Sequence, residues 1–583
     1  MYRQLPTTTL VNAIPSLSFL YKICSLFLIF IIPIHHFPVP SLCPPIPTTA
    51  MNISGKNIPK KLAAAIFLSS VLIITTHIGL VSGGSSPPEA NQLYYQCLEV
   101  PAQEFLDSIL STIDIVRQVL GTVSQFGGMF GDFRLSNAIN DCIDLLDFSA
   151  DELSWAASAT ENPHSSHNST GKLGSDLQTW LSATLVNQDT CADGFDGTDS
   201  FVKGIVTGSL GEITSLVQEL LTQVRPLPSS TDDGGSGGMK LHGAKGDHFP
   251  SWVKPRDQKL LQAGNGANAD VVVAQDGTGD FTSVQDAVMA APNESTDRFV
   301  IYIKKGIYKE NVEIKKKKWN IMMMGDGMDV TVISSDRNFK GGWTTFRSAT
   351  FAVSSRGFIA MDMTFENTAG PENHQAVALR SDSDLSVFYR CSMKGYQDTL
   401  YTHTMRQFYR DCWISGTIDF IFGDGAVVFQ NCHILAKKGL PQQKNTITAQ
   451  GRKDPYQSTG FSFQFCNVTA DSDLLPHLNS TMTYLGRPWK PYSRTIFMQS
   501  YLGSVLRPEG WLEWNGNYAL DTLFYAEYMN YGPGSGLGGR IKWPGFHVLS
   551  SSAQAVNYTV SRFIEGNSWL PSTGVKYEAG FGV

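Results

Sequence analysis

The spacing of like residues in the C-terminal half of the chain limits the fold more than any other feature. Three like pairs recur there at nearly one interval: Gln375 and Gln397, Cys391 and Cys412, and Asp398 and Asp419. The first pair is 22 residues apart, and the other two pairs are 21 residues apart. A repeat of roughly 20 to 25 residues is the length of one coil of a parallel β-helix, in which residues one coil apart lie on neighbouring strands about 4.8 Å apart. We therefore expect each pair to stack.

The segment 269–583 has the sequence pattern of short strands. Apolar runs such as DVVVAQ, RFVIYIKKGIY and RTIFMQSYL are bounded by Gly, Asp, Asn or Pro. Helical stretches long enough to connect every pair of strands are missing, which argues against a doubly wound α/β fold. The strands alone leave a β-solenoid or a β-sandwich, and the repeat favours the solenoid, an all-β parallel β-helix.

The segment 91–225 has a different pattern, with apolar residues three and four positions apart in FLDSILSTIDIVRQVL, LSNAINDCIDLLDFSADELSWAAS and FVKGIVTGSLGEITSLVQELLTQV. This periodicity predicts an all-α helical bundle. The segment 226–268 is rich in Pro, Ser and Gly and cannot bury a core, so it predicts a linker. The β-helix domain would then span 269–583.

We interpret residues 1–90 as a targeting region. An apolar run at 62–81 follows Lys56, Lys60 and Lys61, which predicts a signal peptide or a signal anchor. A second apolar run lies at 17–34, and Met51 is an alternative start. We expect contact with a membrane only through this N-terminal segment before processing. Sequons of the form N-x-S/T agree with a secreted glycoprotein and occur at Asn52, Asn168, Asn293, Asn467, Asn479 and Asn557.

The charge balance and the motif content exclude several classes of function. The chain has 45 Lys and Arg against 52 Asp and Glu, a net charge of −7. No domain carries the basic excess that nucleic-acid binding requires. CxxC and HxxxH spacings are absent, which argues against zinc, and no phosphate loop or dinucleotide fingerprint stands in the required context. We predict neither a metal nor an organic cofactor.

The expected stacking brings together side chains suited to acyl transfer. Asp398 and Asp419 would face each other, and because two neighbouring carboxylates cannot both ionise cheaply, one should hold a proton. Such a pair can divide the roles of acid and nucleophile. The amides of Gln375 and Gln397 could donate hydrogen bonds to a developing oxyanion. Asp419 lies within the apolar stretch ISGTIDFIFG and requires a partner such as an arginine. For each residue alone, a solvated or backbone-capping role is the alternative.

Several motifs resemble those of the plant pectinesterases, or pectin methylesterases, that carry an N-terminal inhibitor-like pro-region. The resemblance rests on GWTTFRSATF (342–351), NHQAVALR (373–380), GYQDTLY (395–401), GTIDFIFG (416–423) and YLGRPW (484–489). The helical region resembles the pectinesterase-inhibitor domain through AINDCIDLLDFSADELSWA (138–156) and TWLSATLVNQDTCADGF (179–195). The resemblance implies a right-handed parallel β-helix, and a secreted enzyme of the cell wall that hydrolyses methyl esters of homogalacturonan to methanol and de-esterified pectin.

The resemblance also implies a role for each residue of the site. Asp419 would be the nucleophile, and Asp398 the acid that protonates methanol and later activates water. Gln375 and Gln397 would donate to the oxyanion, and Arg487 would orient Asp419. Substrate contacts would come from Thr345, Gln375, Arg487 and Trp489. The expected partners are pectin and either the chain's own pro-region or separate inhibitor proteins.

The resemblance has further implications, and the sequence departs from the family in places. Cys142 and Cys191 would form the disulfide of the helical domain, and the first helical hairpin has Cys97 where the family has two cysteines. In the C-terminal domain we expect the pairs Cys391 with Cys412 and Cys432 with Cys466, the first more strongly supported. The processing site reads RDQKLL (256–261) instead of a dibasic pair, so we expect cleavage near Leu261. Asp424 replaces a neutral residue, and we expect its charge to raise the pKa of the aspartate pair.

Two other classes of function stay open at this stage. A polygalacturonase-like β-helix also uses paired carboxylates, but glycoside cleavage passes through an oxocarbenium ion and needs no oxyanion donors such as the two glutamines. Methanol release against new reducing ends separates these two enzymes. A non-catalytic protein that binds pectin or inhibits other esterases is the third hypothesis.

Overall fold

The computed structural model describes residues 95–162, 169–198, 200–225 and 269–582. All of them belong to one compact unit, which spans Pro87–Val583. The predicted targeting region, the linker at 226–268 with its cleavage site, and the sequons at Asn52 and Asn168 lie outside the described residues. The boundaries that we drew at 225 and 269 therefore stay predictions. Within the described ranges, no helix is both long enough and apolar enough to cross a membrane.

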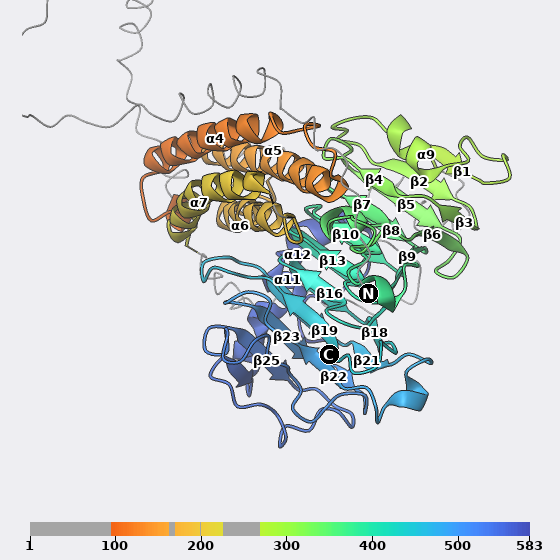
Figure 1. Cartoon of the computed structure of the whole chain (residues 1–583). Coiled ribbons are helices and arrows are strands. Elements are labelled where there is room, and N and C mark those ends of the chain that lie inside the picture. Colours follow the sequence, from red (N-terminus) through yellow and green to blue (C-terminus); the bar gives the residue numbers. More distant parts are fainter. Residues whose placement is uncertain (1–94, 163–168, 199, 226–268, 583) are drawn as a thin grey trace, which may run out of the picture. The chain divides into compact units, whose positions relative to one another are not determined.

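The N-terminal part of this unit is helical, as the periodicity predicted. After the short turn η1 (Tyr95–Cys97) come α4 (Ala102–Ser124), α5 (Phe133–Glu161), α6 (Leu173–Asp193) and α7 (Phe201–Thr222), shown in orange and yellow in Figure 1. Asp132 caps α5 by accepting a hydrogen bond from the Leu135 N–H at 2.7 Å, and the Ser200 hydroxyl caps α7. The predicted disulfide between Cys142 and Cys191 is confirmed and joins α5 to α6.

The C-terminal part is a parallel β-helix, which confirms the predicted fold class (Figure 1). Its described strands form three sheets with parallel pairings between all neighbouring strands. The eleven-stranded sheet contains β1 (Val271–Val273), β2 (Phe299–Ile303), β5 (Ile321–Gly325), β8 (Ile359–Met361), β11 (Ser386–Tyr389), β14 (Arg406–Arg410), β17 (Ala426–Gln430), β20 (Gly460–Gln464), β23 (Arg494–Met498), β25 (Phe524–Tyr528) and β26 (Phe546–Val548).

The other two sheets complete the walls of the β-helix. The seven-stranded sheet contains β4 (Val312–Ile314), β7 (Phe351–Val353), β10 (Leu379–Ser381), β13 (Leu400–Thr402), β16 (Ile421–Gly423), β19 (Asn445–Gln450) and β22 (Thr483–Gly486). The eight-stranded sheet contains β3 (Gly306–Lys309), β6 (Thr331–Ser335), β9 (Thr364–Asn367), β12 (Ser392–Lys394), β15 (Trp413–Gly416), β18 (His433–Ala436), β21 (Asn467–Ala470) and β24 (Tyr501–Leu502).

Short helices and turns occupy the loops and the C-terminal end. They are α9 (Val284–Ala290), α10 (Ser552–Ala555), α11 (Val560–Phe563) and α12 (Gly566–Trp569), with the 3₁₀ turns η2 (Phe346–Ser348), η3 (Pro371–Asn373), η4 (Leu475–His477), η5 (Val556–Tyr558) and η6 (Leu570–Thr573). Trp569 and Leu570 are buried against the eleven-stranded sheet, so the C-terminal helices cover apolar residues of that sheet.

A column of aromatic rings shows why the sequence repeat forms a solenoid. One ring from each successive coil stacks on the next, with centroids 4.4 to 4.9 Å apart, in the order Phe388, Tyr409, Phe429, Phe463 and Phe497. Register pairing places these residues directly opposite one another on β11, β14, β17, β20 and β23. The first step is 21 residues, as predicted, and the step from β17 to β20 is longer because the connecting loops are longer.

The predicted disulfides of the β-helix are wrong, because all four cysteines are free thiols in the structure. Cys391, Cys412, Cys432 and Cys466 are buried and lie just before β12, β15, β18 and β21, so they form a column like the aromatic one. In such a column the side chains run parallel, and each thiol approaches the carbonyls of its own or the preceding coil. Cys412 Sγ donates to the Phe388 carbonyl at 3.2 Å, and Cys466 Sγ to the Phe429 carbonyl at 3.3 Å.

Candidate active site

The two aspartates occupy equivalent positions on adjacent coils. Asp398 and Asp419 each lie two residues before a strand of the seven-stranded sheet, and the register pairs Leu400 with Ile421. The Asp398 N–H donates to the Ile418 carbonyl at 3.1 Å, which extends the ladder through the pair. Both aspartates have positive φ values, 62° and 50°, in the left-handed region that side chains rarely adopt. Such strain is typical of functional positions. The predicted stacking of this pair is therefore present.

Asp419 forms a bidentate ion pair with Arg487. Arg487 donates from Nε to Oδ1 at 2.8 Å and from Nη2 to Oδ2 at 2.6 Å. The Thr446 hydroxyl also donates to Oδ1, at 2.6 Å. Three donors on one carboxylate fix its orientation. Arg487 follows directly after β22, and the structure thus supplies the arginine partner that the apolar setting of Asp419 requires.

Asp398 is in the opposite electrostatic situation. The residue is 7% exposed, and its carboxyl group receives no hydrogen bond from the described residues. Burial raises its pKa well above the ordinary value, and the neighbouring Asp419 carboxylate raises it further, while Arg487 partly offsets both effects. The pair therefore consists of one carboxyl group that receives three hydrogen bonds and one buried carboxyl group whose pKa is raised.

The two glutamines lie beside the aspartates on neighbouring coils. The Ala376 N–H donates to the Gln397 carbonyl at 3.2 Å, which places Gln375 one coil before Gln397 and one position out of register. Both side chains are partly exposed. Neither amide forms a hydrogen bond with another residue in the described part of the chain, so both N–H groups are available to a ligand.

Two tryptophans lie near Arg487. The guanidinium of Arg487 lies 4.3 Å from the ring centroid of Trp514. Trp489 packs edge-on against Phe422 of β16, with ring centroids 6.0 Å apart. Trp489 was predicted from its motif, whereas Trp514 was missed. Trp514 lies in EGWLEWN (509–515), to which the sequence pattern assigned no role.

Thr345 lies further from the aspartates along the sheet than the two glutamines do. It directly precedes the turn η2, which comes before β7, and β7 is separated from β13 by β10. Its neighbour Thr344 donates to Asp141 of α5 at 2.5 Å. The loop that carries Thr345 thus contacts the helical domain.

The helical domain covers this face of the β-helix. Thr190 near the end of α6 lies 2.8 Å from Nε2 of His403, which follows β13. The apolar cluster of the helical domain includes Tyr401 and Phe422, and Trp489 packs against it. A fully buried ion pair, 2.7 Å between Arg406 Nη1 and Asp176 Oδ1, also joins the two domains. Helices and active-site strands therefore share one hydrophobic core.

Asp424 does not act on the aspartate pair as expected. Its carboxylate accepts hydrogen bonds from Gln450 at 2.7 Å, from Gln457 at 2.7 Å and from Thr459 at 2.5 Å. Burial raises the pKa of Asp424 to about 7, although its three donors oppose this shift. The groups that shift the pKa of Asp398 are Asp419 and Arg487 together with burial. The polar shell around Asp424 is the physical reason for this correction.

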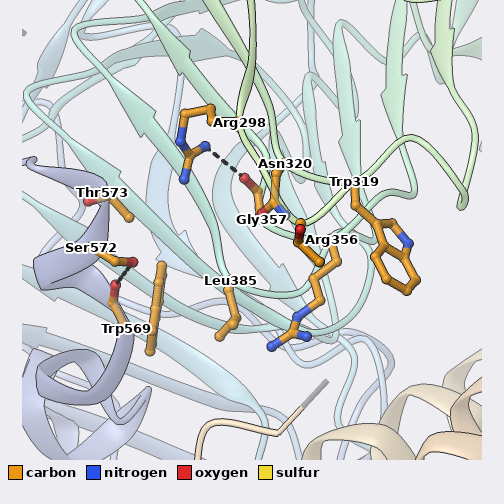
Figure 2. Close-up of a pocket in the computed structure, with 10 residues that line it drawn as sticks. Arg298, Trp319, Asn320, Arg356, Gly357, Leu385, Trp569, Ser572 and Thr573 are labelled. Atoms are coloured by element: carbon orange, nitrogen blue, oxygen red, sulfur yellow. Dashed lines mark hydrogen bonds between the residues drawn. The ribbon is translucent and has the colours of Figure 1, made fainter. Parts of the chain in front are cut away.

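A cavity of about 270 Å³ lies elsewhere, between the starts of β2, β5 and β8 and the C-terminal helices (Figure 2). Arg298 donates there to the Gly357 carbonyl at 3.2 Å, and Trp569 and Ser572 line the opposite side. None of the residues predicted for the site lines this cavity. The predicted aspartates lie instead beside the seven-stranded sheet.

Comparisons with known proteins agree for both domains. The family model "Pectinesterase" matches residues 270–567, and the model "Plant invertase/pectin methylesterase inhibitor" matches residues 86–222. A pectinesterase/pectinesterase inhibitor of Prunus persica is 69% identical over 494 residues, which cover 85% of this chain and 92% of the relative. A probable pectinesterase/pectinesterase inhibitor of Arabidopsis thaliana is 63% identical over 499 residues, with coverages of 83% and 95%.

A solved structure matches the β-helix alone. The pectin methylesterase from carrot superimposes with a TM-score of 0.54 and is 53% identical. The match covers 54% of this chain and 98% of the carrot chain. The carrot chain therefore has a folded structure without a helical domain of this kind.

Proposed function

The chain belongs to the pectinesterase family and is a pectin methylesterase with an N-terminal inhibitor-type domain, and on this premise we propose a role for each residue of its active site. Asp419 is the nucleophile and Asp398 the general acid and base. Gln375 and Gln397 donate to the oxyanion, and Arg487 orients Asp419. The observation that carries these roles is the difference between the two aspartates, because one is held by Arg487 and the other is buried with a raised pKa.

The first half of the reaction transfers the acyl group to the enzyme. An oxygen of Asp419 attacks the ester carbonyl carbon, and the carbonyl electron pair moves to the oxygen, where the amides of Gln375 and Gln397 stabilise the charge. The tetrahedral intermediate then collapses. The bond to the methoxy oxygen breaks, Asp398 gives its proton to that oxygen, and methanol leaves.

The second half returns the enzyme to its starting state. Asp398, now a carboxylate, takes a proton from a water molecule, and the hydroxide oxygen attacks the carbonyl of the acyl-enzyme. The bond to Asp419 breaks, which restores the Asp419 carboxylate and releases a galacturonate unit of the pectin chain. Arg487 stabilises the Asp419 carboxylate both as reactant and as leaving group.

The test is methanol release from highly methylated pectin by the segment 269–583, with Asp419→Asn and Asp398→Asn beside the wild type. We expect both variants to lose activity while they keep the circular dichroism of the wild type. New reducing ends are assayed in the same tubes. Reducing ends without methanol would support a polygalacturonase. Full methanol release by Asp419→Asn would exclude Asp419 as the nucleophile.

We propose further that the helical domain is autoinhibitory and that the enzyme acts in the cell wall after secretion. The contacts of Thr190 on α6 with His403 and Tyr401 support inhibition, since these residues belong to or follow β13, the strand directly after Asp398. The full chain should therefore release methanol more slowly than the segment 269–583 at equal concentration. Equal rates would contradict autoinhibition and would leave the esterase assignment intact.

A further inference from the structure

In the part of the chain that the structure describes, every ion pair between the two domains joins an acidic residue of the helical domain to a basic residue of the β-helix. Aspartates of α5 and α6 pair with lysines and arginines of the β-helix: Asp141 and Asp144 with Arg347, Asp147 and Asp151 with Lys316, Asp176 with Arg406, Asp189 with Lys453, and Asp193 with Lys490. The β-helix thus presents cations to the helices on the face that carries the active site.

Two of these cations lie beside the predicted substrate contact Trp489. Lys453 Nζ is 2.6 Å from Asp189 Oδ1, and Lys490 Nζ is 3.2 Å from Asp193 Oδ2. Asp189 is also 4.0 Å from Lys490, so the two ammonium groups form one cluster. Lys490 Nζ lies 5.2 Å from the centroid of the Trp489 ring. A sugar that stacks on Trp489 would lie next to this cluster.

Arg347 lies on the opposite side of the aspartates along the sheet. It follows Thr345 by two residues and precedes β7, whereas the aspartates precede β13 and β16. The lysines follow β19 and β22, further along the same sheet. Arg347 contacts Asp141 and Asp144 at 2.5 Å each. Basic residues therefore lie on both sides of the two aspartates along the direction in which the coils stack.

The helices and the reaction product present carboxylates in a similar way. Asp189 and Asp193 are four residues apart on α6, so their side chains are neighbours on the helix surface, about 5–6 Å apart. De-esterified galacturonan carries one carboxylate on every sugar. A row of carboxylates on either molecule can pair with the same cations, whereas a fully methylated chain has no charge to offer.

We propose that Lys453, Lys490 and Arg347 bind the carboxylates of de-esterified galacturonate units next to the ester that reacts, and that the helical domain blocks the enzyme by presenting aspartates to these same cations. This proposal rests on the esterase function and on the site described above. It predicts that the enzyme prefers esters adjacent to free acid units. It also predicts that de-esterified galacturonan competes with the helical domain.

The experiment compares two substrates in the segment 269–583, whose extent matches the solved carrot chain. KM and kcat for methanol release are measured on fully methylated and on half-methylated oligogalacturonate for the wild type and for the double variant Lys453→Gln/Lys490→Gln. We expect KM for the half-methylated substrate to rise roughly threefold to thirtyfold, since two ion pairs are lost, and the effect on the uncharged substrate to be smaller.

Lys316→Gln is the matched control. Lys316 pairs with Asp147 and Asp151 of the helical domain as the other lysines do, but it follows β4 at the far edge of the sheet. Its removal should leave both KM values unchanged. An equal KM change on both substrates for the double variant, or the same change for Lys316→Gln, would overturn the proposal. No methanol from the wild type on the fully methylated substrate would instead refute the esterase function.

A second measurement uses the full chain. Asp189→Asn/Asp193→Asn should raise its methanol release. Added polygalacturonate, which carries no methyl esters, should first increase the methanol release of the wild-type full chain, because it displaces the helices from the cations. In the variant this increase should be smaller. No increase in the wild type at any concentration would contradict competition for the same cations.

Discussion

Two arginines, the buried Arg406 and the partly exposed Arg487, show how similar pairs of charges can have different consequences. Arg406 binds Asp384 with two prongs, at 3.0 and 2.6 Å, and Asp176 with its remaining nitrogen at 2.7 Å. Arg487 binds Asp419 with two prongs and leaves Asp398 without a hydrogen bond from it. The first arginine satisfies both of its carboxylates, and the second satisfies only one.

The pKa values of the aspartates follow from this difference. Burial raises the pKa of Asp384, but the pairing with Arg406 outweighs burial and the net shift is downward. Burial also raises the pKa of Asp398, and there the arginine does not compensate. A fully paired cluster is suited to hold two domains together, whereas a cluster with one unpaired carboxyl can supply both an acid and a nucleophile.

Removal of Arg406 should have the largest effect on stability. Arg406→Met would leave Asp176 and Asp384 buried without their cation, so we expect the free energy of unfolding of the full chain to fall by about 3–5 kcal/mol. Urea unfolding followed by circular dichroism measures this change. Arg410→Met is the control, because Arg410 pairs with Asp411 nearer the surface and should matter by about 0–1 kcal/mol. Equal losses for both variants would contradict the comparison.

Removal of Arg487 should act on catalysis instead. Arg487→Gln takes away both prongs from Asp419, and we expect kcat for methanol release to fall by about 10²–10³. Arg487→Lys keeps the charge but not the fork, so its kcat should lie between those of the glutamine variant and the wild type. Steady-state kinetics of the segment 269–583 measure both. A lysine variant as active as the wild type would show that charge alone orients Asp419.

The sequence could predict that the two candidate aspartates lie together because they share the period of the coil. Asp398 and Asp419 are one coil apart, and the motif that contains Arg487 supplied the partner for Asp419. Arg406 and Asp176 are 230 residues apart in different domains, and no local pattern connects them. Their pairing depends on how the helices contact the β-helix, which the sequence of either domain does not contain.

The cysteines show the limit of the same period. Cys391 and Cys412 have the 21-residue spacing of the aspartates, and the prediction that they stack is confirmed by the register. The inference from stacking to a disulfide is wrong, since the parallel side chains leave each thiol near a backbone carbonyl. Spacing predicts position on the solenoid but not the bond that a side chain makes there.

The two aspartates should give opposite dependences of stability on pH. The raised pKa of Asp398 means that the folded state keeps a proton that the unfolded state loses, so its stabilising contribution is present below the unfolded pKa of about 3.9 and is lost as pH rises through the folded pKa. The lowered pKa of Asp384 means that its contribution is present above about pH 3.9 and is lost as pH falls through the folded pKa.

The free energies of unfolding of the wild type, Asp398→Asn and Asp384→Asn, measured from about pH 2 to pH 8, test this contrast. As pH rises, the free energy of unfolding of the wild type should fall relative to that of Asp398→Asn. The expected fall is about 1.4 kcal/mol for each unit of pKa shift that is crossed. Asp384→Asn should show the opposite slope at the acidic end. Parallel slopes for the two variants would mean that the two arginines affect their aspartates alike.

The smallest expected effect concerns the second contact of Arg487. Arg406 is held by carboxylates, whereas Arg487 has Asp419 on one side and the ring of Trp514 at 4.3 Å. Trp514→Leu removes this contact, and we expect kcat/KM for methanol release to fall roughly twofold to fivefold, as a cation–π contact of about 0.5–1 kcal/mol implies. Trp413→Leu is the control, because Trp413 lies on the eight-stranded sheet and stacks on His433. If only the Trp514 variant loses activity, then the ring replaces the second carboxylate that Arg406 has, and it does so without adding the negative charge that would compete with Asp419 for the guanidinium.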